Sequence, residues 1–191
     1  MSEGLGWTNS ILIYKDIRVI RLLILGFSSG LPILLIFSTL SLWLKSAGLD
    51  RSTITLFSWA GLAYSFKFLW APIIDKMPIN LLTNKFGHRR SWLIVSQISL
   101  IILLISIGFV DPKNNLFLMG ILIVLVGFSS ATQDAIIDTY RIESAPQKLQ
   151  SAMSGTYIIG YRLGMIAAGA GSLLLAAWFG GDNEIYNVHA W

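Results

Sequence analysis

Five long apolar segments constrain what this chain can fold into. Each is about 20 residues or longer, and a helix of that length, rising about 1.5 Å per residue, crosses the ~30 Å hydrocarbon core of a bilayer. The chain is 54% hydrophobic and 13% charged, with a mean hydropathy of +0.68. The sequence therefore predicts an all-α integral membrane protein whose main surroundings are lipid. The expected spans are about 21–44, 54–75, 91–110, 116–139 and 152–179.

Lysine and arginine are unevenly distributed between the two ends of these spans. One side would carry nine of them and the other side three. Cytoplasmic loops hold the excess of positive charge, so we expect residues 1–18 in the cytoplasm, a five-helix bundle over 19–179, and a periplasmic stub over 180–191. A net charge of +4 distributed in this way predicts no nucleic-acid partner. The nine are Lys15, Arg18, Arg21, Lys76, Lys85, Arg89, Arg90, Arg141 and Lys148.

The stretch SSATQDAIIDTYR at 129–141 ends the fourth apolar run with two carboxylates. An aspartate at membrane depth is costly, so it usually faces a bundle interior or a water-filled cavity. By helical rise, Asp134 lies roughly 8 Å inside the cytoplasmic end of the span, and Asp138 lies almost at that end. Their spacing of four residues places both on one helix face. Gln133 points to a different face and has two interpretations, a site residue or a packing contact.

Two cations lie inside the spans at similar depth. By helical rise, Lys67 is about 12 Å and Arg162 about 15 Å from the cytoplasmic face. One interpretation is a site in which Lys67 and Arg162 bind an anionic or hydroxyl-rich solute while Asp134 takes up and releases a proton. The other is a fixed Asp134–Arg162 pair that holds two spans together, with Lys67 reaching the interface. Tyr161, beside Arg162, fits either stacking on a sugar ring or interface anchoring.

The fifth span is rich in small residues. Gly160 and Gly164 form a GxxxG step that Ala168 extends. Small residues at this spacing let a second membrane helix approach closely, so we expect a helix-packing face here.

The loop between the second and third spans carries a second cluster of charges. Asp75 and Lys76 open it, and Gly87, Arg89 and Arg90 close it. This arrangement resembles the signature between helices two and three of the major facilitator superfamily of transporters. The positive-inside rule alone explains the basic residues but not the aspartate at the end of the second span.

Several stretches together resemble the AmpG-type muropeptide permeases of that superfamily. They are LLILGFSSGLP at 22–32, LAYSFKFLWAPIIDK at 62–76, FGHRRSW at 86–92, SATQDAIIDTYR at 130–141 and GYRLGM at 160–165. The resemblance covers about residues 18–180, and the combination is more specific than any single motif.

The resemblance implies a proton-driven symporter of the bacterial inner membrane. Its substrates would be N-acetylglucosamine-anhydro-N-acetylmuramyl peptides, imported from periplasm to cytoplasm, with the proton as coupling ion and no other cofactor. It assigns gating roles to Asp75 and Arg89. Such transporters have at least twelve helices in two bundles, and the substrate lies between the bundles. We therefore expect this chain to supply the first five helices, to need a companion chain, and not to transport alone.

Two alternatives come from other classes. One is a small integral-membrane enzyme acting on lipid-linked sugars, with Asp134 and Asp138 as acid and base or as metal ligands. The other is a non-functional remnant of a split transporter gene. The chain has no cysteine, and its two histidines, His88 and His189, are too far apart in sequence to suggest a metal pair.

Overall fold

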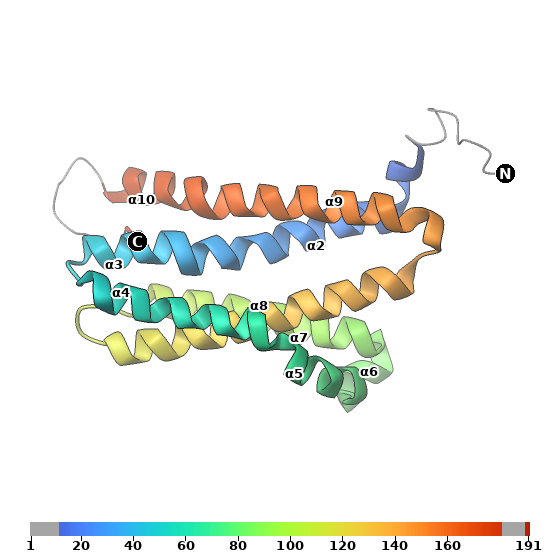
Figure 1. The fold of residues 1–191 in the computed structure, drawn as a ribbon, viewed down its shortest axis with the longest axis horizontal. Coiled ribbons are helices and arrows are strands. Elements are labelled where there is room, and N and C mark those ends of the chain that lie inside the picture. Colours follow the sequence, from blue (N-terminus) through green and yellow to red (C-terminus); the bar gives the residue numbers. More distant parts are fainter. Residues whose placement is uncertain (1–11, 181–189) are drawn as a thin grey trace.

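The computed structural model describes residues 12–180 and 190–191, and this part of the chain contains helices and no strand. The helices run back and forth along the long axis of the molecule (Figure 1). Most of the predicted segments 1–18 and 180–191 lies outside the described residues. The elements are η1 (Ile13–Lys15), α2 (Ile17–Leu34), η2 (Leu35–Thr39), α3 (Leu40–Ser46), α4 (Arg51–Phe57), η3 (Ser58–Gly61), α5 (Leu62–Lys76), α6 (Asn80–Phe86), α7 (His88–Gly108), α8 (Leu116–Ser144), α9 (Gln147–Ile166), η4 (Ala167–Gly171) and α10 (Ser172–Gly180).

Within the described residues, four helices are long and apolar enough to cross a membrane. They cover Ile17–Ser46, His88–Gly108, Leu116–Ser144 and Gln147–Gly180. The predicted second span, 54–75, is helical throughout but is not one of the four. It is divided among α4, the 3-10 turn η3 and α5, and Lys67 with several hydroxyl and indole groups lowers its hydropathy. The structure also has the short helix α6 in the loop between α5 and α7, which the sequence did not predict.

Helices α2 and α9 pack along their length, and glycines form the contact. A methyl group added to Gly26 or Gly30 of α2, or to Gly160 or Gly164 of α9, would overlap the backbone of the facing helix. Ala168, one turn further on, is also buried. The predicted packing role of the GxxxG step is therefore confirmed. The carbonyl oxygens that these methyl groups would meet belong to Tyr157, Tyr161, Leu23 and Phe27, respectively.

Both long helices of this pair contain one π-helical turn, η2 in the first and η4 in the second. The two turns are joined across the interface, because the hydroxyl of Thr39 donates a hydrogen bond to the carbonyl oxygen of Ala168 at 2.9 Å. The Ser172 hydroxyl lies 2.9 Å from the same Thr39 oxygen. Wider turns of this kind are tolerated where side chains satisfy the freed backbone groups.

Helix α8 is the centre of the bundle and packs against α7, α5 and α2. Its first half enters one apolar core with Met119, Ile123 and Val126, and its last turns enter a second core with Ile137. Along α8, Ser130, Gln133 and Asp134 lie between the residues that enter these two cores. The apolar packing on either side therefore fixes the position of the polar segment.

Candidate functional site

A polar cluster lies in the middle of the bundle, where α8 meets α2 and α7. Gln133 is fully buried, and its side-chain amide donates hydrogen bonds to Ser28 at 2.8 Å and to Ser29 at 3.4 Å. The amide of Gln97 on α7 donates to the same Ser28 hydroxyl at 3.2 Å. The Ser28 hydroxyl is therefore the link between three helices. Gln133 is one of its two donors, so it is more than a packing contact.

Several polar atoms around this cluster are buried with no hydrogen-bond partner in the described part of the chain. They are Tyr64 Oη on α5 and, on α8, Ser130 Oγ, Gln133 Oε1 and Asp134 Oδ1. A buried polar atom normally finds a partner, because leaving it unpaired costs about 1–3 kcal/mol. Four such atoms on neighbouring turns of two packed helices mark this region as a site able to accept protons or ligand hydrogen bonds.

The Asp134 carboxylate is the ionisable group at the centre of these atoms. Ser29 lies against it, and Lys67 and Asp138 act on it electrostatically. Its charge in turn acts on the phenols of Tyr157 and Tyr161, which α9 brings to the same region. The two tyrosine rings lie 6.1 Å apart between centroids at an angle of 39°. Asp134, Lys67 and Tyr161 therefore lie in one region of the bundle.

Lys67 forms its ion pair with Asp138. The Nζ–Oδ2 distance is 3.6 Å, and the side chains are 37% and 48% exposed. Arg141, one turn further along α8, lies 3.9 Å from the other Asp138 oxygen. Asp138 thus holds two cations near the end of the helix, whereas Asp134 has no ion pair within the described residues.

Arg162 forms no ion pair with Asp134 within the described residues, so the fixed Asp134–Arg162 pair of the second interpretation is not present there. The Arg162 side chain is exposed, and its Nη1 atom lies 3.7 Å from the sulfur of Met165. Helical geometry gives the reason. Arg162 lies two positions after Gly160, which faces α2, and a step of two positions is about 200° of rotation around an α-helix. The close packing of the glycines on α2 therefore turns Arg162 away from the cluster.

The loop between α5 and α7 contains a second charged site. Arg89 forms ion pairs with Asp75 and with Glu143 of α8; its Nη2 and Nε atoms lie 2.9 and 3.2 Å from the two Glu143 oxygens. Asp75 and Arg89, the two residues to which the resemblance assigns gating roles, are thus in direct contact. Two-point binding of a planar guanidinium fixes the angle between partners as well as their distance. This network joins the end of α5, the start of α7 and the end of α8.

Gly87 lies between α6 and α7 with a φ of +84°. This left-handed conformation is readily available to glycine, so the residue permits the sharp entry into α7. The imidazole of His88 lies 2.9 Å from the carbonyl oxygen of Ile74. Lys76 and Arg90, the remaining predicted residues of this loop, are exposed.

Five residues of these two sites were not predicted from the sequence: Ser28, Ser29, Gln97, Tyr64 and Glu143. Two signals were available: adjacent serines interrupt the apolar run of α2, and Gln97 is an isolated amide in an aliphatic span. A polar side chain in a span usually faces other helices. Glu143 gave no comparable signal, because an acid at the end of a membrane helix is ordinarily exposed to water.

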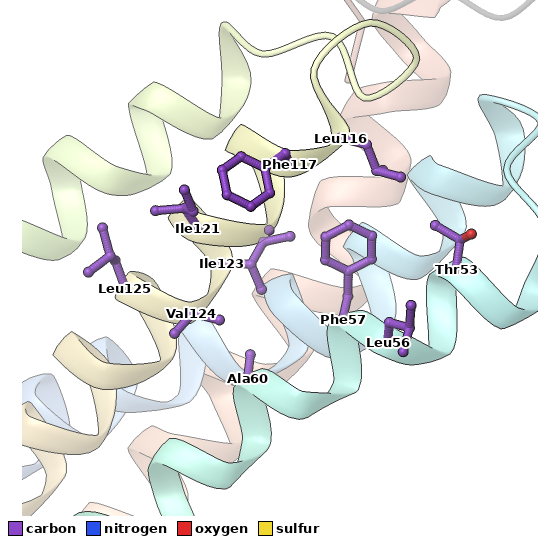
Figure 2. A pocket seen from close by; sticks show the side chains of 11 residues that line it. Thr53, Leu56, Phe57, Ala60, Leu116, Phe117, Ile121, Ile123, Val124 and Leu125 are labelled. Carbon is purple, nitrogen blue, oxygen red and sulfur yellow. The ribbon is translucent and has the colours of Figure 1, made fainter.

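A hollow of about 710 Å³ lies near the opposite end of α8, between that helix and α4 with η3 (Figure 2). Its walls include Phe57, Ala60, Ile123 and Val124, and Thr53 contributes the only hydroxyl among its lining residues. No titratable group lines it. The hollow therefore offers apolar contact alone, and the chemistry of the chain belongs to the polar cluster and the charged loop.

Long apolar helices with a polar cluster between them define an all-α integral membrane protein of several spans. The family described as acetyl-coenzyme A transporter 1 matches residues 18–122. The chain belongs to this family, which is a transporter family of the major facilitator type.

Full-length relatives agree with this assignment. The transporter AmpG 4 of Rickettsia felis is 41% identical over 173 residues, which is 91% of this chain and 42% of the relative. The anhydromuropeptide permease of Escherichia coli K12 is 40% identical over 169 residues, 88% of this chain and 34% of the permease. The resemblance to AmpG-type permeases is therefore confirmed, and the chain spans about two fifths or less of these relatives. They are named transporters or permeases, which does not favour the membrane-enzyme alternative.

Proposed function

We propose that this chain supplies the first helices of a proton-coupled importer of anhydromuropeptides in the bacterial inner membrane, with its N-terminus in the cytoplasm. The observation that carries the proposal is the buried cluster of unpartnered polar atoms around Asp134. The muropeptide substrate is taken from the printed name of the Escherichia coli relative. The family description, which names acetyl-coenzyme A, belongs to the wider family.

Asp134 is the proposed proton carrier. Its carboxylate has one buried oxygen with no partner in the described chain, so protonation would supply a donor inside the cluster without breaking an existing ion pair. Asp138 is less suited, because Lys67 and Arg141 hold it as a charged partner. A carboxylate inside a membrane bundle is a usual proton-relay group in transporters. No cofactor besides the proton is proposed.

Substrate binding is proposed for the residues around this carboxylate. A muropeptide combines sugar hydroxyls with peptide carboxylates. Gln133 and Tyr161 offer hydrogen-bonding groups, and Tyr161 also presents a ring that can stack on a sugar. Lys67 and the exposed Arg162 offer positive charge, and Arg162 has no carboxylate partner within the described residues. Asp138 is proposed to hold Lys67 in place between substrates.

The Asp75–Arg89–Glu143 network is proposed as the gate. It connects the ends of three helices through charges that lie near the cytoplasmic surface, and Gly87 allows the loop to turn. Lys76 and Arg90 add positive charge to the same loop. An ion-pair network of this kind can hold one arrangement of helices and release it when the partners separate.

A companion chain or segment is proposed to complete the transport path. The chain matches about two fifths of its Rickettsia relative. The proposal is that the missing helices form the second wall of the substrate cavity. Proteoliposomes containing this chain alone are therefore expected to show no proton-dependent uptake of muropeptide. Uptake by such liposomes would overturn the need for a companion.

The main test is a chimera in which this chain replaces the matching part of the Escherichia coli permease, expressed in cells that lack their own permease. Uptake of labelled anhydromuropeptide is measured with and without a proton gradient. The chimera should accumulate substrate only with the gradient, and Asp134→Asn should abolish accumulation while the protein still reaches the membrane. The matched control is Asp111→Asn, an acid in the loop before α8. Gradient-driven accumulation by Asp134→Asn would show that Asp134 is not the carrier.

A further inference from the structure

A basic crevice of about 410 Å³ lies at the end of the bundle where α2 and α7 begin and α8 ends. Arginines from two helices that are distant in sequence converge on it. Arg18 and Arg21 come from the first turns of α2, and Arg89 and Arg90 come from the first turn of α7. Tyr140 and Glu143 of α8 complete its wall.

Only one of the four guanidinium groups is neutralised by a described side chain. Arg89 forms ion pairs with Asp75 and Glu143. Arg18, Arg21 and Arg90 form no ion pair with any residue that the structure describes, and all three are exposed. The positive-inside rule accounts for basic residues on this side of the membrane, but it does not require them to converge on one hollow. The crevice therefore has the charge to bind an anion.

An apolar groove of about 280 Å³ adjoins the crevice. Arg21, Arg90 and Tyr140 line both hollows, and Ile24, Leu25 and Leu93 line only the groove. Ile24 and Leu25 lie three and four positions after Arg21, about one helical turn further along α2 toward the middle of the span. The groove thus extends from the charged crevice into the depth that acyl chains occupy. A soluble anion would use the crevice but has no need of the groove.

We infer that the crevice and the groove together bind one anionic glycerophospholipid, with its phosphodiester between Arg21 and Arg90 and an acyl chain along Ile24, Leu25 and Leu93. Guanidinium groups suit phosphate oxygens because they donate two parallel hydrogen bonds. Basic pockets between membrane helices on the cytoplasmic side are a usual form of lipid head-group site. This inference does not depend on muropeptide transport.

The test measures lipid retained by the full chain in detergent, using native mass spectrometry with added dioleoyl phosphatidylglycerol or dioleoyl phosphatidylcholine. The wild-type chain should bind one phosphatidylglycerol in preference to phosphatidylcholine. The double variant Arg21→Gln/Arg90→Gln should lose at least about tenfold in affinity for phosphatidylglycerol, as expected for the loss of charge-assisted hydrogen bonds. The matched control Lys85→Gln/Lys148→Gln removes the same charge from the same end of the bundle, outside both hollows, and should keep its affinity within about twofold.

Two further arms separate a lipid site from a soluble-anion site. Ile24→Trp fills the groove and leaves every arginine in place, so it should weaken phosphatidylglycerol binding. Glycerol 3-phosphate shares the phosphate but has no acyl chain, so it should compete only weakly. Circular dichroism and gel filtration establish that each variant is folded. The inference would be overturned if the two double variants lost affinity for phosphatidylglycerol equally. It would also be overturned if Ile24→Trp bound phosphatidylglycerol fully, or if glycerol 3-phosphate competed effectively.

Discussion

The side-chain amide of Gln133 on α8 donates a hydrogen bond to the hydroxyl of Ser28 on α2 at 2.8 Å. The same hydroxyl accepts a second hydrogen bond from Gln97 on α7. Three helices are therefore joined at one oxygen, in a part of the bundle flanked by apolar cores. The proposed proton carrier Asp134 is the next residue along α8, so the joint also positions that carboxylate.

Replacing Gln133 with leucine should disturb this joint. The change removes the side-chain amide that donates to Ser28 and Ser29. It should lower the unfolding free energy by about 1 kcal/mol, because hydrogen bonds between membrane helices contribute modestly to stability. Thermal unfolding in detergent measures the stability, and muropeptide uptake by the chimera, which should fall more sharply, measures function. Gln147→Leu, at an exposed position on α9, is the control. Normal uptake by Gln133→Leu would mean that the joint does not position Asp134.

Gly26→Ala should separate α2 from α9. The added methyl group meets the backbone carbonyl of Tyr157, which cannot rotate away as a side chain could. Overpacking of this kind costs about 1–3 kcal/mol. Gly155→Ala is the matched control, because nothing lies within 4 Å of its added carbon, and alanine there should be neutral or stabilising by up to about 1 kcal/mol. Thermal unfolding of both variants in detergent checks the expectation, and equal midpoints would contradict it.

Arg89→Lys should loosen the loop between α5 and α7. Lysine keeps the charge but cannot bind both Glu143 oxygens as the guanidinium does. Asp75 and Glu143 are 45% and 53% exposed, so the loss in stability should be small, about 0.5–1 kcal/mol. Hydrogen exchange over Asn80–Phe86 should become faster. A double-mutant cycle with Glu143→Gln gives the coupling between the two residues, and zero coupling would show that the ion pair does not hold the loop.

Asp50 makes a pH-dependent contribution to the start of α4. Hydrogen bonds from Ser52 and Thr53 hold the pKa of its carboxyl well below the ordinary value of 3.8. Because the folded-state pKa is depressed, the stabilisation is complete above that ordinary value and is lost as the pH falls toward the folded-state pKa. Asp50→Ala should therefore lower the thermal midpoint at pH 7, and the difference from wild type should narrow below pH of about 4. Asp16→Ala removes the cap of α2 and provides a comparison, because it shows how the loss of a cap at a second helix affects the thermal midpoint. A difference that stays constant with pH would contradict the capping role.

Much of the architecture could be predicted from residue order. Long apolar runs have few ways to satisfy their backbone in lipid, so helices near the predicted spans follow from hydropathy alone. The packing role of Gly160 and Gly164 followed from spacing, because close approach requires small residues on one face. The resemblance singled out Asp75 and Arg89 as gating residues, but their contact with each other came from the structure.

The partners of the buried polar groups were decided by tertiary structure alone. Position along each helix predicted a similar membrane depth for Asp134, Lys67 and Arg162. Depth alone does not determine which way a side chain faces. The glycine contact between α2 and α9 rotates Arg162 outward, and the packing of α5 on α8 brings Lys67 to Asp138. Gln133 became the central residue because the serines of α2 face it. At four of the five predicted spans, the sequence by itself determined which segments are long and apolar enough to cross a membrane, since hydropathy is a property of each segment. Only the packed bundle decided which side chains meet, because a contact depends on the rotation of every helix against its neighbours.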